Sequence, residues 1–180
     1  MLFGLIVFAA IVLVVFGLAV TYNGLVAGAE RAARAWNELD ALLHQRHDEI
    51  PKLIELCEPH LKRERGAFER VLAARAQVFG ARQTRAVDTL SQAEAALRAE
   101  LAALIALAAG NAELGASPAF GMLRQRNATL DGEITERRAL YNEAVTRYNA
   151  AIARMPGNVV AVLGGFRPLR ALGVDAASRA

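Results

Sequence analysis

The sequence has little of what disulfide-bonded, β-sheet and redox proteins depend on. A single cysteine among 180 residues excludes an internal disulfide. Cys57 falls on an apolar helix face, where we expect a buried and unreactive thiol. Aromatic residues make up only 6% of the chain, while alanine and leucine dominate. Runs that alternate in the manner of a strand are missing beyond the N-terminal segment, so we predict an all-α protein.

Charge is missing from the first 29 residues, and blocks of like charge are missing from the rest. The 21 basic and 18 acidic residues are interspersed and leave a net charge of +3. This mixture is typical of solvated helix faces, whereas a nucleic-acid-binding protein more often carries a basic block interleaved with aromatic residues. We therefore expect no nucleic-acid partner.

The uncharged start predicts a transmembrane anchor at residues 1–21. The apolar run, residues 2–20, is close to the roughly 20 residues that cross the hydrocarbon of a bilayer. A secretory signal peptide would begin with a basic region, which is missing, although Gly17-Leu18-Ala19 resembles a cleavage site. Arg31 and Arg34 follow the run and no basic residue precedes it. The positive-inside rule then places the remainder of the chain in the cytoplasm.

A heptad repeat of apolar residues begins directly after the apolar run. Spacings that alternate between four and three predict a helix with one face, here called the seam, buried against other helices. Arg46 is its only member that is not apolar, and Pro51 lies inside the repeat without disturbing its phase, so we expect the helix to continue through Pro51. The seam consists of Leu25, Ala29, Ala32, Trp36, Leu39, Leu43, Arg46, Ile50, Leu53 and Cys57.

The phase of the repeat changes at Pro59, and two structures account for the change. In one, a single helix continues with a stutter to about residue 79, through Leu61, Phe68, Leu72 and Phe79, and Gly80 ends it. In the other, a new helix begins near Pro59. The continuous helix gives three soluble helices, leaves part of the seam without a partner in its own chain and favours homo-oligomers. A turn gives four soluble helices and returns the C-terminus to the membrane.

Two further helices complete an expected antiparallel bundle over residues 22–155. The first is expected from Thr84, as N-cap, to Gly110, with Glu94 interrupting an otherwise apolar face. The second begins at Ser117-Pro118 and reaches Met155, with Asn127 and Arg137 as polar intrusions. Residues 156–180 form an apolar tail with glycine and proline. Its apolar, glycine-rich stretch at residues 158–168 is too short to span a bilayer, and either caps the bundle or a neighbour or lies on the membrane.

Several motifs resemble the LemA family of bacterial membrane proteins. The resemblance covers residues 20 to 168, and it implies one N-terminal membrane helix, an α-helical bundle and no established enzyme activity or catalytic residues. The motifs are Tyr22-Asn23-Gly24-Leu25-Val26, Arg34-Ala35-Trp36-Asn37-Glu38-Leu39-Asp40, Leu43 to Leu53 with its Glu49-Ile50-Pro51, Tyr141-Asn142 with Tyr148-Asn149, and Pro156-Gly157-Asn158.

The chain offers no catalytic or cofactor motif that outweighs a structural interpretation. His44 and His47 share a helix face with Asp48, but neither a His-Glu-x-x-His order nor a second Glu-x-x-His pair is present. We expect no metal, no cofactor and no enzyme activity. We expect instead a scaffold in the bacterial inner membrane that contacts lipid, copies of itself and other membrane proteins, or alternatively an accessory subunit of a membrane protease or transporter. The residues expected at contacts between copies are Trp36, Leu39, Leu43, Ile50, Leu53, Val159, Val162, Leu163 and Phe166.

Overall fold

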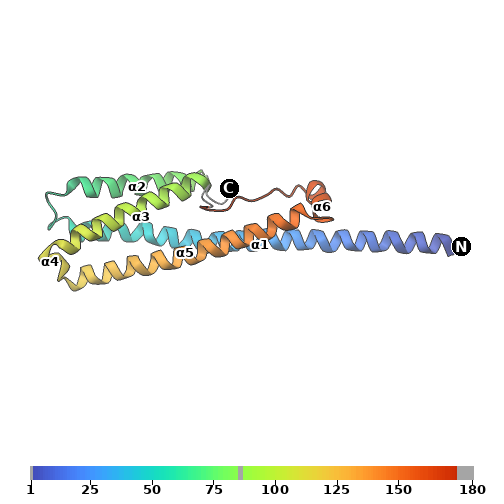
Figure 1. The fold of residues 1–180 in the computed structure, drawn as a ribbon, viewed down its shortest axis with the longest axis horizontal. Helices are drawn as coiled ribbons and strands as arrows, with labels where there is room; N and C mark the ends of the chain where they lie inside the picture. The colour runs from blue at the N-terminus through green and yellow to red at the C-terminus, as the bar shows by residue number, and fades with distance from the viewer. Residues whose placement is uncertain (1, 85–86, 174–180) are drawn as a thin grey trace, which may run out of the picture. The chain divides into compact units, whose positions relative to one another are not determined.

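The structure is a computed structural model that describes residues 2–84 and 87–173. Over these residues the regular secondary structure consists of α-helices alone, which confirms the all-α prediction (Figure 1). The helices are α1 (Leu2–Cys57), α2 (Arg65–Gln83), α3 (Val87–Gly110), α4 (Ala112–Gly115), α5 (Pro118–Ala153) and α6 (Gly157–Gly164).

Helix α1 is continuous through Pro51, as the unbroken heptad phase predicts, and it ends at Cys57. The amide of Glu58 still donates to the carbonyl of Ile54, and the chain then turns over residues 58–64 before α2 begins. A single helix to residue 79 is therefore wrong, and the alternative of a turn near Pro59 is confirmed, although the new helix begins at Arg65 and not at Pro59. The chain has four long helical segments after the apolar run and not three.

The helices divide into two compact units, which are described separately. One unit, here called the span unit, comprises Met1–Asn37 and Leu140–Ala171. The other, here called the four-helix unit, comprises Glu38–Ala139 and Leu172–Ala180. Both α1 and α5 contribute one end to each unit.

In the four-helix unit, neighbouring segments run antiparallel. Arg82 near the end of α2 donates to Asp40 early in this part of α1 at 2.9 Å, whereas Arg75 donates to the carbonyl of His47 at 3.2 Å. The same reversal relates α1 to α5, because Glu38 pairs with Arg137 at 3.2 Å whereas Arg46, later in α1, pairs with Asp131, earlier in α5. The core lies between these segments, and its largest fully buried side chains are Leu39, Ile50, Val71, Val78, Leu90, Leu97, Leu101, Leu104, Leu114, Phe120 and Leu130.

The buried face of α2 is only partly the one that the large apolar residues indicate, because Phe68 is buried at 7% exposure and the other two are not. Leu72 and Phe79 are 45% and 49% exposed. The buried face is made mostly of small residues at spacings of four and three, namely Ala67, Val71, Ala74, Val78 and Ala81. Small side chains let α2 lie close to its neighbours, whereas Leu72 and Phe79 lie to the side of this face and stay about half exposed.

Several helix ends follow their sequence signals and others do not. The amide of Phe120 donates to Ser117 Oγ at 3.5 Å, so Ser117 caps α5 as expected. Helix α3 ends at Gly110 as expected, but α2 continues past Gly80 to Gln83. Thr84 is the C-cap of α2 and not an N-cap, since its hydroxyl donates back to the carbonyls of Gly80 and Ala81.

In the span unit, α6 packs on α1. Leu25, Val160 and Ala161 form a small buried cluster, with Leu18, Ile152 and Phe166 packed around it. Met155, expected on the α5 seam, is instead 74% exposed just beyond the end of that helix.

Candidate functional site

Four of the residues expected at contacts between copies lie inside the four-helix unit. Leu39, Leu43, Ile50 and Leu53 are between 1% and 4% exposed. Their apolar surface is therefore covered by helices of the same chain. A role for them between copies stays a prediction.

The other five expected contact residues belong to the span unit and differ in exposure. Trp36 is half-buried and packs edge-to-face on Tyr141, with ring centroids 5.4 Å apart. Phe166 is half-buried in the same arrangement on Tyr22, at 5.5 Å. In contrast, α6 presents three side chains outward, namely Val159 at 43%, Val162 at 83% and Leu163 at 80% exposure.

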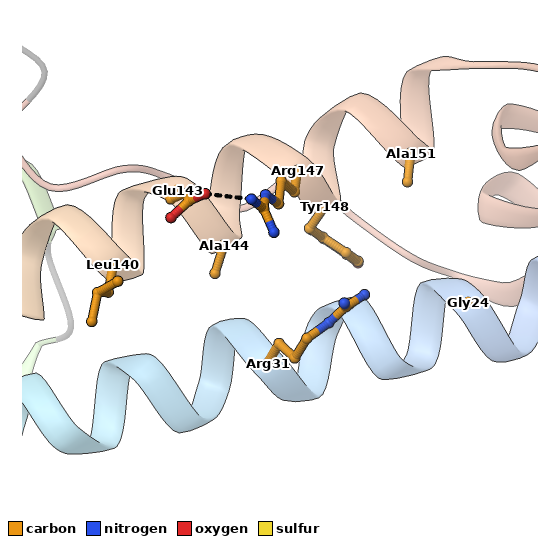
Figure 2. Close-up of a pocket in the computed structure, with 9 residues that line it drawn as sticks. Gly24, Arg31, Leu140, Glu143, Ala144, Arg147, Tyr148 and Ala151 are labelled. Carbon is orange, nitrogen blue, oxygen red and sulfur yellow. Dashed lines mark hydrogen bonds and ion pairs between the residues drawn. The ribbon is translucent and has the colours of Figure 1, made fainter.

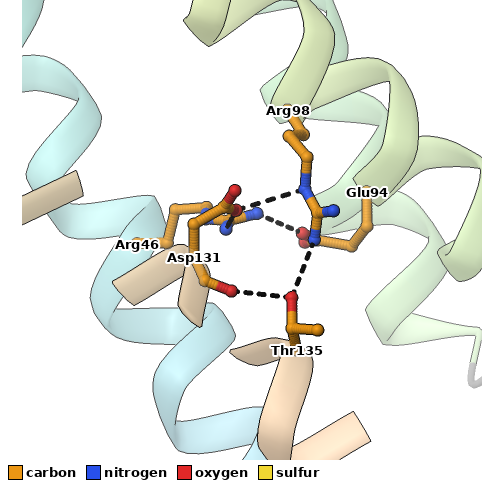
Figure 3. A network of polar contacts seen from close by, with 5 residues as sticks. All are labelled: Arg46, Glu94, Arg98, Asp131 and Thr135. Atoms are coloured by element: carbon orange, nitrogen blue, oxygen red, sulfur yellow. Dashed lines mark hydrogen bonds and ion pairs between the residues drawn. The ribbon is translucent and has the colours of Figure 1, made fainter. Parts of the chain in front are cut away.

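The most strongly buried charge among the described residues is Arg46, at 2% exposure (Figure 3). Its guanidinium donates to Glu94 of α3 at 3.0 Å and to Asp131 of α5. Arg98 of α3 forms a second ion pair with Asp131 at 3.2 Å. Thr135, one turn along α5, donates to the backbone carbonyl of Asp131 at 2.8 Å. The network therefore joins α1, α3 and α5 through charge-assisted hydrogen bonds.

Burial dominates the electrostatics of this network. The Glu94 side chain is only 15% exposed. Its desolvation raises the pKa of the carboxyl, and the nearby Arg46 and Arg98 cations partly offset that rise. Within the described residues, Nε of Arg46 and Oε1 of Glu94 have no hydrogen-bond partner in the protein. Such a network tends to fix which helices meet and in what register, at some cost in stability.

The sequence contains a signal for half of this network. Arg46 and Glu94 are the residues that interrupt the apolar faces of α1 and α3, and they have opposite charge. Two opposite charges at seam positions on different helices are explained if they meet, which is what the structure shows. The sequence gives no comparable signal for Asp131 as a member of this network, because Asp131 stands beside the seam residue Leu130 and not on the seam.

The histidine cluster lies on the side of α1 that faces α2. His44 Nε2 is 3.6 Å from Asp48, and His47 stacks on Phe79 with centroids 5.8 Å apart. Burial, followed by the Arg75 cation, lowers the pKa of His47. Among the described residues no three His, Cys, Asp or Glu side chains are grouped to hold a metal ion. The arrangement is that of a partly buried polar contact between two helices.

Cys57 is fully buried at the end of α1, as its place on the seam predicts. Burial raises the pKa of its thiol to about 11, so the reactive thiolate is scarce at neutral pH.

A groove of about 140 Å³ lies in the span unit, between the α1 and α5 segments (Figure 2). Tyr148 and Arg31 point into it, and a Cβ on Gly28 would stand 3.2 Å from the Tyr148 ring. Arg147 at its rim is paired with Glu143 of the same helix. Its volume is below the roughly 300 Å³ at which small-molecule pockets begin, so its geometry does not favour such a ligand.

One of two comparisons with known proteins gives a match. The family model of the LemA family matches residues 35–180. The match begins after the apolar run and covers the remainder of the chain. A search of curated proteins found no match.

Proposed function

Because the chain belongs to the LemA family, we propose that it is a non-enzymatic, membrane-anchored scaffold that assembles with copies of itself at the bacterial inner membrane. The observation that carries this proposal is the character of α1. Within the part of the chain that the structure describes, one helix is long and apolar enough to cross a membrane; it begins near the N-terminus, and its most apolar 18 residues are not buried in the protein. The same helix continues without a break to Cys57, in the core of the four-helix unit.

The proposed orientation places the helical units on the cytoplasmic side. Arg31 and Arg34 lie on α1 after the apolar run, and basic residues near the end of a span are retained in the cytoplasm. A cysteine introduced at an exposed position, such as Ala128→Cys, and treated in intact cells with a membrane-impermeant thiol reagent tests this orientation. Labelling only after the inner membrane is opened supports the proposed side, and labelling of spheroplasts contradicts it.

Exposed apolar side chains outside the apolar run support assembly through protein contacts. Contiguous apolar patches often mark association sites, and Leu72 and Phe79, seven residues apart, lie on one side of α2. The α1 seam does not add to this support, because the turn at residues 58–64 lets a single chain bury it. The exposed residues in the four-helix unit are Leu72, Phe79, Leu107 and Met122.

The same burial of the seam favours a second candidate, an accessory subunit of a membrane enzyme such as a protease or transporter. A chain that satisfies its own seam is free to act as a monomer beside a different protein. The two candidates differ in what remains together after gentle solubilisation.

The mass of the full-length protein in nanodiscs or mild detergent, measured by native mass spectrometry, decides between them. A defined oligomer of the single chain supports the scaffold. A monomer, with a second protein recovered in fixed ratio, supports the accessory subunit. Phe79→Ser together with Leu72→Ser is expected to lower the oligomer size, whereas the matched exposed change Gln77→Ser on α2 is expected to leave it unchanged.

A further inference from the structure

We propose that α6 is a second membrane contact, which lies in the headgroup region of the bilayer that α1 crosses and turns Val159, Val162 and Leu163 toward lipid. The inference rests on the anchoring part of the proposed function. It adds a surface to that function, because a single span requires no other part of the chain to touch the membrane.

The position of α6 along α1 supports this proposal. Helix α6 packs against Leu18 and Leu25, on either side of residue 20, where the apolar run ends. Phe166, just after α6, meets the ring of Tyr22, which follows the run by two residues or about 3 Å of helix rise. Aromatic side chains such as Tyr22 prefer the membrane interface. A span seated with residues 2–20 in hydrocarbon thus holds α6 at headgroup depth.

The composition of α6 suits that depth. Its eight residues carry no charge, and one face, Val160 and Ala161, is buried at 6% and 3% exposure. The opposite face leaves Val162 and Leu163 more than three-quarters exposed. A helix that is apolar on both faces and packed on one lacks a partner for the other. Lipid is the apolar phase available there, because α6 lies beside the end of the apolar run of α1.

Basic residues flank α6 on both sides. Arg154 precedes it, Arg167 follows it, and both are exposed. Arginine side chains at such positions can extend to the phosphates while the apolar residues between them enter the acyl region. No acidic residue occurs between positions 144 and 173, so this end of the span unit suits the anionic inner leaflet of a bacterial membrane.

The turn into α6 is tightly built. A Cβ added to Gly157 would stand 2.1 Å from the carbonyl oxygen of Ala151, so only glycine fits there. Gly165 ends α6 with a φ of 71°, a left-handed conformation that glycine adopts without strain. The amide of Phe166 then donates to the carbonyl of Ala161 at 2.9 Å.

The chain after α6 is held to α5 by hydrogen bonds to its backbone. The Asn149 amide donates to the carbonyl of Leu169 at 2.8 Å and accepts from its N–H at 2.9 Å. The Tyr141 hydroxyl donates to the carbonyl of Arg170 at 2.9 Å. Because α6 is fixed at both ends, its outward face is a preformed surface, which lowers the entropy lost when it meets a membrane.

Site-directed spin labelling of the full-length protein tests the inference. Nitroxides are placed singly at Val162→Cys and Leu163→Cys in a Cys57→Ala background, in vesicles of phosphatidylethanolamine and phosphatidylglycerol. Val12→Cys, in the middle of the apolar run, is the lipid reference, and Ala128→Cys, exposed on α5, is the aqueous reference. Collision with oxygen, which concentrates in lipid, is compared with collision with a water-soluble nickel chelate.

We expect oxygen collisions to exceed nickel collisions for labels at positions 162 and 163, by a smaller margin than at position 12. At position 128 we expect nickel collisions to exceed oxygen collisions. Nickel collisions that dominate at 162 and 163 while 12 stays in lipid would overturn the α6 contact and leave the anchor standing. Spectral broadening at 162 or 163 that disappears on dilution with unlabelled protein would show a second copy on this face and overturn it as well. If 12 itself is exposed to water, the anchor and the α6 contact both fail.

Discussion

Replacing Arg46 by methionine removes the cation that Glu94 and Asp131 share, and keeps an apolar stem that reaches about as far as the Nε atom of arginine. Loss of one partner from a buried ion pair costs about 3–5 kcal/mol, because a desolvated charge is left without compensation. Asp131 keeps Arg98 at 3.2 Å and is 34% exposed, so it recovers part of its solvation. Glu94, at 15% exposure, recovers little. We therefore expect Arg46→Met to lower the free energy of unfolding by about 3 kcal/mol, at the lower end of that range.

The pH dependence of this loss identifies its cause. The pKa of Glu94 is already raised in the folded protein by burial, and the loss of Arg46 removes a charge that opposes the rise. In the variant, the folded state therefore binds a proton on Glu94 at a pH where the unfolded state does not, so acidification stabilises the variant relative to the parent. The difference between the two proteins is expected to be smaller at about pH 5 than at about pH 7.5.

Pulse proteolysis in urea, applied to the full chain in nanodiscs, measures both quantities. The matched control is Arg46→Met with Glu94→Leu, which removes both buried charges and leaves Asp131 with Arg98. Apolar replacement of a buried pair is often neutral, so this double variant should return to within about 1 kcal/mol of the parent. A loss below about 1 kcal/mol for Arg46→Met, equal at both pH values, would refute the assignment of a desolvated pair.

Three further perturbations follow from the same structure. Leu43→Asp puts a carboxylate at a position that is 4% exposed, and should lower the free energy of unfolding by about 4 kcal/mol. The control is Ala41→Asp at an exposed neighbouring position. An unchanged melting temperature and oligomer size for Leu43→Asp would contradict the place of Leu43 in the core. Gly157→Ala should displace α6 and speed tryptic cleavage after Arg154, whereas Gly121→Ala, where a Cβ meets nothing within 4 Å, should not. Because the pKa of His47 is lowered in the folded protein, the unfolded state binds a proton on His47 first as pH falls below 6.5, and the free energy of unfolding should decline there. The check is the urea midpoint as a function of pH. A His47→Gln variant whose midpoint declines as steeply as that of the parent would exclude His47 as the source.

The sequence predicts most of α1, α3 and α5, because their interiors are lined by large apolar residues at heptad spacing. It is only partly right on α2, where Phe68 is buried as expected, but alanine and valine form most of the buried face and Leu72 and Phe79 are about half exposed. Hydrophobic periodicity weighs each residue by its own apolarity, whereas burial depends on which face a neighbouring helix can approach closely. Alanines at 67, 74 and 81 permit that approach and contribute little to the pattern.

The change of phase at Pro59 shows a second limit. A stutter within a helix and a turn between two helices shift the heptad frame in the same way. The local pattern of apolar residues therefore cannot predict whether the chain continues or reverses. The choice depends on long-range contacts, such as those of Arg82 with Asp40 and Arg70 with Glu100, which only a folded chain brings together. Glu94 and Arg46 stand out in the sequence as charged residues on apolar helix faces. Predicting that they form an ion pair would also require knowing which helices pack together.

The two hydrogen bonds that hold residue 169 to Asn149 of α5 involve only the backbone N–H and carbonyl of residue 169. Any amino acid with a free N–H can therefore occupy position 169 without loss of these two bonds. The constraint falls on the other side, since Asn149 must supply a donor and an acceptor together and Asn149→Asp retains only the acceptor. Among relatives, position 169 should consequently vary more than position 149, because the path of the chain at residue 169 depends on the side chain of residue 149 and not on its own.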